Sequence, residues 1–195
     1  DLVAANLVLE KSPKDSTAAI ALSAAILAKR EPDVIIGSFA ADHVITESKV
    51  FQDAVREAIE VAATGKIVTI GIEPSSPSVA FGYIKTGAAL DVAGAPSALS
   101  VDKFIEKPKM ATARKYVESG NYLWNAGMFI APAALLLEQL KQTEPELHAA
   151  LMEIADAWDG MYRESVMHRV WPTLKKIAID YAIAEPAAER GHARN

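Results

Sequence analysis

The sequence predicts an α/β protein whose mostly parallel sheet is flanked by helices, and three observations point to this class. Residues 33–39 and 66–72 are continuous apolar runs, which is typical of strands that are covered on both faces. Between them, Phe51, Val55 and Ile59 recur at the spacing of an amphipathic helix. The order strand, helix, strand implies right-handed crossovers that join parallel strands, as in a Rossmann-like sheet.

Local start and stop signals delimit the other elements. Ser12 and Pro13 mark the start of a helix over residues 16–30, which Glu31 and Pro32 end. Further strands are expected at 3–9, 81–86 and 99–105, with a strand or extended segment at 124–130. Further helices are expected near 48–64, 110–119, 132–142, 144–158, 161–170 and 177–189.

The composition excludes several classes of protein. The 195 residues carry a formal charge of −5 without a block of Lys and Arg, so we expect no nucleic-acid partner. The absence of cysteine excludes disulfides and thiolate metal sites. No apolar run in residues 1–195 reaches the roughly 18 to 20 residues that cross a bilayer, and we expect no signal peptide. A cytoplasmic protein without a membrane partner is therefore expected. The chain begins at Asp1 rather than Met, so we expect it to be part of a longer protein.

An acidic residue follows the apolar run at 33–39. Open parallel sheets bind ligands at the carboxyl ends of their strands, and Asp42 lies in the loop after the strand expected at 33–39. A carboxylate here could bind Mg²⁺, which takes one or two carboxylates together with phosphate oxygens. The alternative is a loop carboxylate that accepts hydrogen bonds from nearby backbone N–H groups.

A pair of opposite charges follows the strand expected at 99–105. Glu106 can accept hydrogen bonds from sugar hydroxyls, and Lys107 can bind a phosphate as a point charge. Neighbouring side chains of an extended chain point to opposite sides, so the two would hold different parts of one ligand. The alternative is a solvated strand end before a helix that begins near Pro108.

Two further residues could contact a ligand. Gly82 lacks a side chain, so a ligand could approach its backbone N–H closely, although a strand glycine also marks a bulge. Asn125 offers a donor and an acceptor, although a lone Asn is often a turn residue. The sequence shows no Ser/His/Asp arrangement, no His pair at metal spacing and no intact Gly-rich phosphate loop. Covalent catalysis is therefore not favoured.

Taken together, these segments resemble the mannose-1-phosphate guanylyltransferases of the sugar nucleotidyltransferase family. FIEKPKMATARKYVESGNYLWNAGMFI is similar to their sugar-binding segment, GSFAADHVI to their metal-bearing loop, and EKSPKDSTAAIALSAA to their nucleotide-side segment. VTIGIEPSSPSVAFGYIKTG and WPTLKKIAIDYAIAEPAA fit the same family in the same order. Glu-Lys-Pro alone occurs in nucleotidyltransferases of several base specificities, whereas the string ending in Trp-Asn-Ala-Gly-Met-Phe favours the mannose and GDP branch.

The resemblance implies the nucleotide-diphospho-sugar transferase fold and the transfer of GMP from GTP to mannose 1-phosphate, which yields GDP-mannose and pyrophosphate. It implies Mg²⁺ as the cofactor, with Asp42 as one ligand, and it makes Asp42 and Lys107 the catalytic residues. The binding residues that it implies are Gly82, Glu106, Lys107 and Asn125 for the sugar phosphate, with Asp15 and Thr17 near the guanine or ribose.

The chain departs from the family at both ends. The Gly-x-Gly-x-Arg phosphate loop and the later Trp-x-Asp-Val-Gly segment, which carries a second metal ligand, do not occur in it. We therefore expect residues 1–195 to be a partial catalytic domain. Two alternatives stay open: a nucleotidyltransferase for another hexose 1-phosphate or base, and a non-catalytic nucleotide-sugar binding regulatory subunit. GTP and mannose 1-phosphate are the expected partners, and the sequence leaves a homodimer open.

Overall fold

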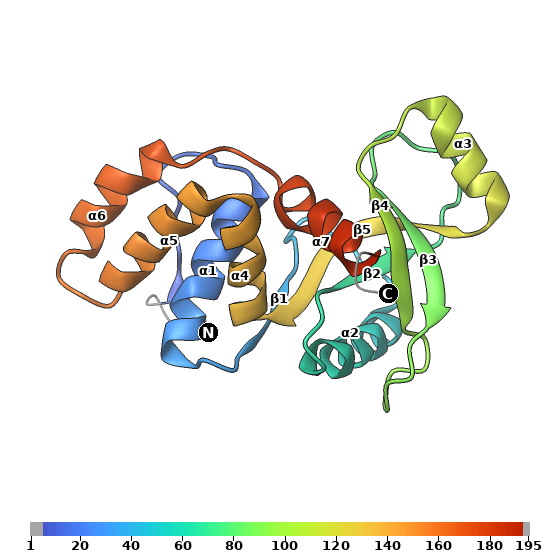
Figure 1. The fold of residues 1–195 in the computed structure, drawn as a ribbon, viewed down its shortest axis with the longest axis horizontal. Helices are drawn as coiled ribbons and strands as arrows, with labels where there is room; N and C mark the ends of the chain where they lie inside the picture. Colours follow the sequence, from blue (N-terminus) through green and yellow to red (C-terminus); the bar gives the residue numbers. More distant parts are fainter. Residues whose placement is uncertain (1–5, 193–195) are drawn as a thin grey trace.

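A computed structural model describes residues 6–192 and contains a five-stranded sheet with helices packed against it (Figure 1). None of the helices in this part of the chain is long and apolar enough to cross a membrane. The elements in chain order are α1 (Ser16–Arg30), β1 (Ile35–Ser38), α2 (Ser48–Ala63), β2 (Val68–Ile72), β3 (Tyr83–Ala89), β4 (Leu99–Ile105), α3 (Met110–Ser119), β5 (Tyr122–Pro132), α4 (Ala133–Thr143), α5 (Pro145–Ala157), α6 (Arg163–Val170), the 3₁₀ turn η2 (Trp171–Thr173), the π-helical turn η3 (Asp180–Ala184) and α7 (Glu185–His192).

The long strand β5 organises the sheet. β2 pairs with it from Val68↔Ile130 to Ile72↔Trp124. β1 pairs with the same strand near residues 129–132, and β3 near residues 122–124. Since Ile130 and Trp124 each pair with β2 and with one other strand, β1 and β3 must share the edge of β5 that lies opposite β2. β4 extends the sheet beyond β3.

The expected α/β class with helices flanking a sheet is confirmed, but the expected parallel pairing is wrong. Every strand pair in the described chain is antiparallel. β1 and β2 do run in the same direction, as the strand–helix–strand order predicts, but β5 lies between them and runs the opposite way. The strand expected at 3–9 begins outside the described residues, and residues 7–9 are not in a strand.

Alternating residues bury both faces of the central strands. On one face, Ile130 packs with Ala58 and Ala62 of α2. On the other, Phe129 and Ile36 join the main core beneath the remaining helices. Burial on both faces explains why β1 and β5 are continuously apolar rather than alternating in polarity.

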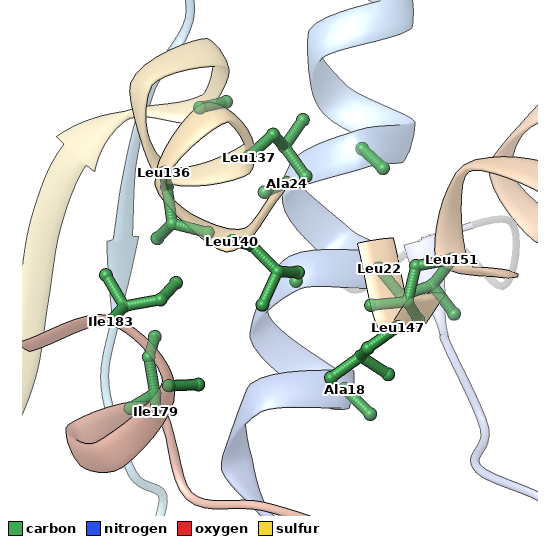
Figure 2. Packing of buried hydrophobic residues seen from close by; sticks show 14 of the residues in the cluster. Ala18, Leu22, Ala24, Leu136, Leu137, Leu140, Leu147, Leu151, Ile179 and Ile183 are labelled. Carbon is green, nitrogen blue, oxygen red and sulfur yellow. The ribbon is translucent and has the colours of Figure 1, made fainter. Parts of the chain in front are cut away.

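The main core lies between α1, α4 and α5 (Figure 2). Four fully buried alanines of α1 allow close helix contacts, and leucines of α4 and α5 fill the space around them. The buried residues of this core include Ala18, Ala21, Ala24, Ala25 and Leu22 of α1, Leu136, Leu137 and Leu140 of α4, and Leu147 and Leu151 of α5. This helical layer also holds η2 and η3, and both Ile179, which precedes η3, and Ile183 of η3 pack into the same core.

Candidate functional site

A cavity of about 510 Å³ opens where β1 and β3 stop short of each other along β5. The last pair of β1 is Ser38↔Phe129, and the first pair of β3 is Tyr83↔Trp124. Residues 125–128 of β5 thus have no paired strand on this side within the described chain, and all four line the cavity. The gap in the sheet creates the space for a ligand.

A bulge in β5 shapes the floor of this cavity. β2 advances only from Thr69 to Gly71 while β5 covers the residues from Phe129 to Asn125. Gly127 adopts a φ of 69°, in the left-handed region that favours glycine. Bulges of this kind often lie beside functional sites, because they redirect side chains.

Glu106 and Lys107 enter the cavity from the end of β4. The Glu106 side chain is 6% exposed, and its Oε1 lies 3.1 Å from Nζ of Lys107, whose side chain is 57% exposed. The expectation that the two side chains point to opposite sides is wrong, because Lys107 has a φ of 44° instead of extended backbone. The ion pair therefore presents a buried carboxylate and an accessible ammonium to one ligand. The expected helix after Pro108 is confirmed as α3.

Gly82 makes room for the Glu106 carboxylate. A Cβ atom at this position would lie 2.5 Å from Oε2 of Glu106. The Gly82 carbonyl accepts a hydrogen bond of 2.8 Å from the backbone N–H of Asn125, which ties the start of β3 to the bulge. The glycine is required here because the carboxylate occupies the space of a side chain; direct contact of its backbone with a sugar stays a prediction.

Asn125 is a buried polar residue at the centre of the site, with 8% of its surface exposed. Its Oδ1 accepts hydrogen bonds from Oγ1 of Thr69 at 2.7 Å and from the backbone N–H of Gly127 at 3.1 Å. Its Nδ2 donates to Oδ1 of Asp180 at 2.8 Å. These bonds leave one Nδ2 hydrogen for a ligand, so the predicted contact with the sugar is limited to one donated bond.

The sequence prediction missed two carboxylates, Asp180 and Glu185. Asp180 lines the cavity, and Oε1 of Glu185 accepts a hydrogen bond of 3.0 Å from the backbone N–H of Glu106. A single acidic residue within the apolar run 177–184 was the available signal, because a charge there must face a polar space or a partner. The helix expected at 177–189 is replaced by η3, which begins at Asp180, and α7, which begins at Glu185.

The carboxylates of Glu106 and Asp180 lie near the Lys107 ammonium, and Glu185 lies next to Glu106. Burial raises the pKa of Glu106, and the nearby charge of Asp180 adds to the effect. Burial likewise raises the pKa of Asp180, while the positive charge of Lys107 lowers it. The hydrogen bond with Glu106 raises the pKa of Lys107 and keeps the ammonium charged. A ligand that suits this arrangement carries hydroxyl donors for the carboxylates and an anionic group for Lys107.

Asp42 lies at the cavity together with His43, Val44 and Ile45 of the loop after β1. Its side chain is exposed, and residues 6–192 contain no group of three His, Cys, Asp or Glu residues that could enclose a metal ion. One exposed carboxylate suits a Mg²⁺ that arrives with a nucleotide, since this ion keeps phosphate oxygens and waters as its other ligands. The role of Asp42 as a metal ligand stays a prediction.

The predicted nucleotide-side residues lie next to the site and do not line the cavity. Asp15 caps α1 by accepting a hydrogen bond from the N–H of Ser16 at 2.9 Å, and its backbone has a φ of 69°. Its charge raises the pKa of Asp180, which places it near the cavity. The Thr17 side chain is fully buried, and its Oγ1 has no hydrogen-bond partner in the described part of the chain. The binding of a nucleotide by these two residues stays a prediction.

Comparisons with known proteins agree with the resemblance in the sequence. The sequence profile of the nucleotidyl transferase family matches residues 2–171. The chain is 38% identical over 188 residues to a mannose-1-phosphate guanylyltransferase from Escherichia coli, covering 94% of this chain and 39% of that protein. It is 35% identical over 187 residues to the xanthan biosynthesis protein XanB from Xanthomonas campestris, covering 94% of this chain and 38% of that protein.

A solved structure agrees as well. A crystal structure described as a mannose-1-phosphate geranyltransferase from Thermus thermophilus matches with a TM-score of 0.77 and 28% identity, over 93% of this chain and 50% of that one. The chain spans about two fifths of the length of the curated relatives that it matches.

Proposed function

The chain belongs to the nucleotidyl transferase family, and from this premise we propose that the protein transfers GMP from GTP to mannose 1-phosphate and releases pyrophosphate. The single observation that carries the proposal is the pairing of Glu106 with Lys107 in a cavity next to Asn125 and Gly82. A sugar 1-phosphate has hydroxyls at one end and an anion at the other. The carboxylate and the ammonium match these two ends.

The chemistry needs positioning and charge neutralisation more than proton transfer. An oxygen of the sugar phosphate attacks the α-phosphorus of GTP, a new P–O bond forms, and the bond to the β-phosphate breaks with pyrophosphate as the leaving group. The attacking oxygen is already an anion, so the site requires no general base. Lys107 holds the sugar phosphate in place, and orientation of this kind lowers the barrier. Bound through Asp42, Mg²⁺ would neutralise charge on the nucleotide phosphates.

The choice of mannose and guanine is supported by the names of the relatives and by the string from Phe104 to Phe129. One assay distinguishes mannose and guanine from an alternative sugar or base. The complete encoded protein is given Mg²⁺, mannose 1-phosphate and one of GTP, UTP, dTTP or ATP, and pyrophosphate release is measured. Glucose 1-phosphate then replaces mannose 1-phosphate. We expect the highest kcat/KM with GTP and mannose 1-phosphate, and release with no pair of substrates would overturn the proposal.

The metal role of Asp42 is tested in the same assay. Asp42→Ala is expected to lower kcat by about 100-fold or more, because it removes a direct ligand of a charge-neutralising ion. Asp33→Ala, a change of another exposed aspartate outside the cavity, is the matched control and should leave kcat within about twofold of the starting value. Equal kcat values for the two variants would show that Asp42 does not bind the catalytic metal.

The regulatory-subunit alternative makes a different prediction. A regulatory protein would bind the sugar nucleotide without releasing pyrophosphate, and its encoded protein would lack a Gly-x-Gly-x-Arg loop upstream of Asp1. The cytoplasmic location, the homodimer and the lack of nucleic-acid or membrane partners stay predictions.

A further inference from the structure

The backbone of Asp180 is anchored on both sides by core residues. Ile179 and Ile183 are 2% and 1% exposed, and both point toward Leu136 in the main core (Figure 2). The N–H of Ile179 also donates a hydrogen bond of 2.9 Å to Oγ of Ser16. Because its neighbours are fixed in the core, Asp180 is held at the cavity by the fold and not by a mobile loop.

The orientation of the Asp180 carboxylate is fixed by Asn125. The N–H of Gly127 can only donate, so the atom of the Asn125 amide that faces it must be the oxygen. The amide nitrogen then faces Asp180 and donates to it. A carboxylate has about four acceptor sites, so the bond from Asn125 leaves acceptor capacity for a ligand in the cavity that Asp180 lines.

The cavity is lined by charged groups of both signs. Lys107 supplies the ammonium that suits a phosphate, while Asp180 is a carboxylate that would repel one. A neutral hydroxyl is the group that a carboxylate accepts without repulsion. Glu106 is paired with Lys107, so Asp180 offers the cavity a second carboxylate that can accept a ring hydroxyl.

We propose that Asp180 accepts a hydrogen bond from one ring hydroxyl of the hexose and so determines which sugar 1-phosphate is used, with Asn125 as the positioning residue that orients it. The inference rests on the proposed function, because the sugar is taken to be that of the 1-phosphate bound at Lys107.

A double cycle of protein and substrate changes tests the contact. The complete encoded protein and its Asp180→Asn variant are assayed with mannose 1-phosphate and with its 2-, 3-, 4- and 6-deoxy analogues. Asn keeps the shape and the bond from Asn125 but removes the charged acceptor. We expect the variant to lose about 10- to 100-fold in kcat/KM with mannose 1-phosphate. The original protein should show a loss of the same size with the one deoxy analogue that lacks the hydroxyl bound by Asp180. The Asp180→Asn variant assayed with that analogue should lose less than about twofold more in kcat/KM than either change alone. The KM for GTP should stay unchanged.

Two controls separate contact from structure. Asp91→Asn makes the same chemical change at an exposed position outside the cavity and should leave every value unchanged. Asn125→Ala should weaken the same analogue coupling, and adding Asp180→Asn to it should leave that coupling almost unchanged, because both changes disturb the contact made by Asp180. Thermal melting of each variant confirms that it is folded.

The outcomes are distinguishable. If the original protein turns over mannose 1-phosphate, and every analogue lowers kcat/KM by the same factor in the original protein and in the variant, this inference alone is overturned. If the original protein does not turn over mannose 1-phosphate, the same cycle is measured as Kd by calorimetry, where coupling at one hydroxyl supports the contact. Neither turnover nor binding of any hexose 1-phosphate overturns the proposed function together with this inference.

Discussion

Substituting Gly82 with Ala should damage the site without unfolding the protein. The new Cβ would lie 2.5 Å from Oε2 of Glu106, where an ordinary contact begins at 3.4 Å, so the carboxylate must move by about 0.9 Å. The displaced atom is the end of a flexible side chain, so we expect the free energy of unfolding to fall by less than about 1 kcal/mol. A misplacement of about 1 Å in a reacting complex costs about 100-fold in rate, and we expect that loss in kcat/KM for mannose 1-phosphate.

The matched control is Gly87→Ala. Gly87 lies further along β3, and its added Cβ would also meet side-chain oxygens of β4, those of Asp102 and Ser100, but these lie outside the cavity. Urea unfolding and pyrophosphate release are measured for both variants. We expect similar stability changes and a loss of kcat/KM only for Gly82→Ala. Equal kcat/KM for the two variants would show that the Glu106 carboxylate can move without affecting catalysis, contrary to its role in binding the sugar.

Three further predictions concern stability. Because burial raises the pKa of Asp180, the native state binds more protons than the unfolded state, and stability is lost as pH rises from about 4 through the folded pKa. The difference in free energy of unfolding between Asp180→Asn and the original protein should therefore increase in favour of the variant between about pH 4 and 7. Urea titrations at several pH values measure this difference, and a difference that does not change with pH would contradict the prediction. Leu140→Ala removes a fully buried side chain and should cost about 2 to 5 kcal/mol in the same titrations. Lys14→Met removes the ammonium whose bonds to two carbonyls of the 171–174 turn measure 2.7 and 2.8 Å, and should cost about 1 to 3 kcal/mol.

Local elements were predictable because their signals are local. The helix over 16–30 and the strand over 99–105 have the observed bounds, since caps, prolines and apolar runs lie within a few residues of each end. The pairing of strands was not predictable in this way. The sequence between β1 and β2 implies a crossover, but it contains no signal that β5, over 50 residues later, inserts between them.

The site was predictable where residues lie at strand ends and was missed where the fold alone brings them together. Glu106 and Asp42 follow expected strands, so a general rule for sheets selected them, and both line the observed cavity. The rule assumed parallel strands, yet it succeeded because β1 and β4 run toward the same gap from opposite ends. Asp180 is 55 residues from Asn125 along the chain, and no spacing links the two.

The most direct test of the account is whether Lys107 binds the phosphate of mannose 1-phosphate. Calorimetric titrations of the complete encoded protein with mannose 1-phosphate and with mannose, at saturating Mg²⁺ and a non-hydrolysable GTP analogue, are compared with those of Lys107→Met. If Lys107 binds the phosphate, the variant should bind mannose 1-phosphate about 10- to 100-fold more weakly, while any binding of mannose changes by less than about twofold. An unchanged Kd for mannose 1-phosphate would contradict the assignment of this cavity as the sugar-phosphate site.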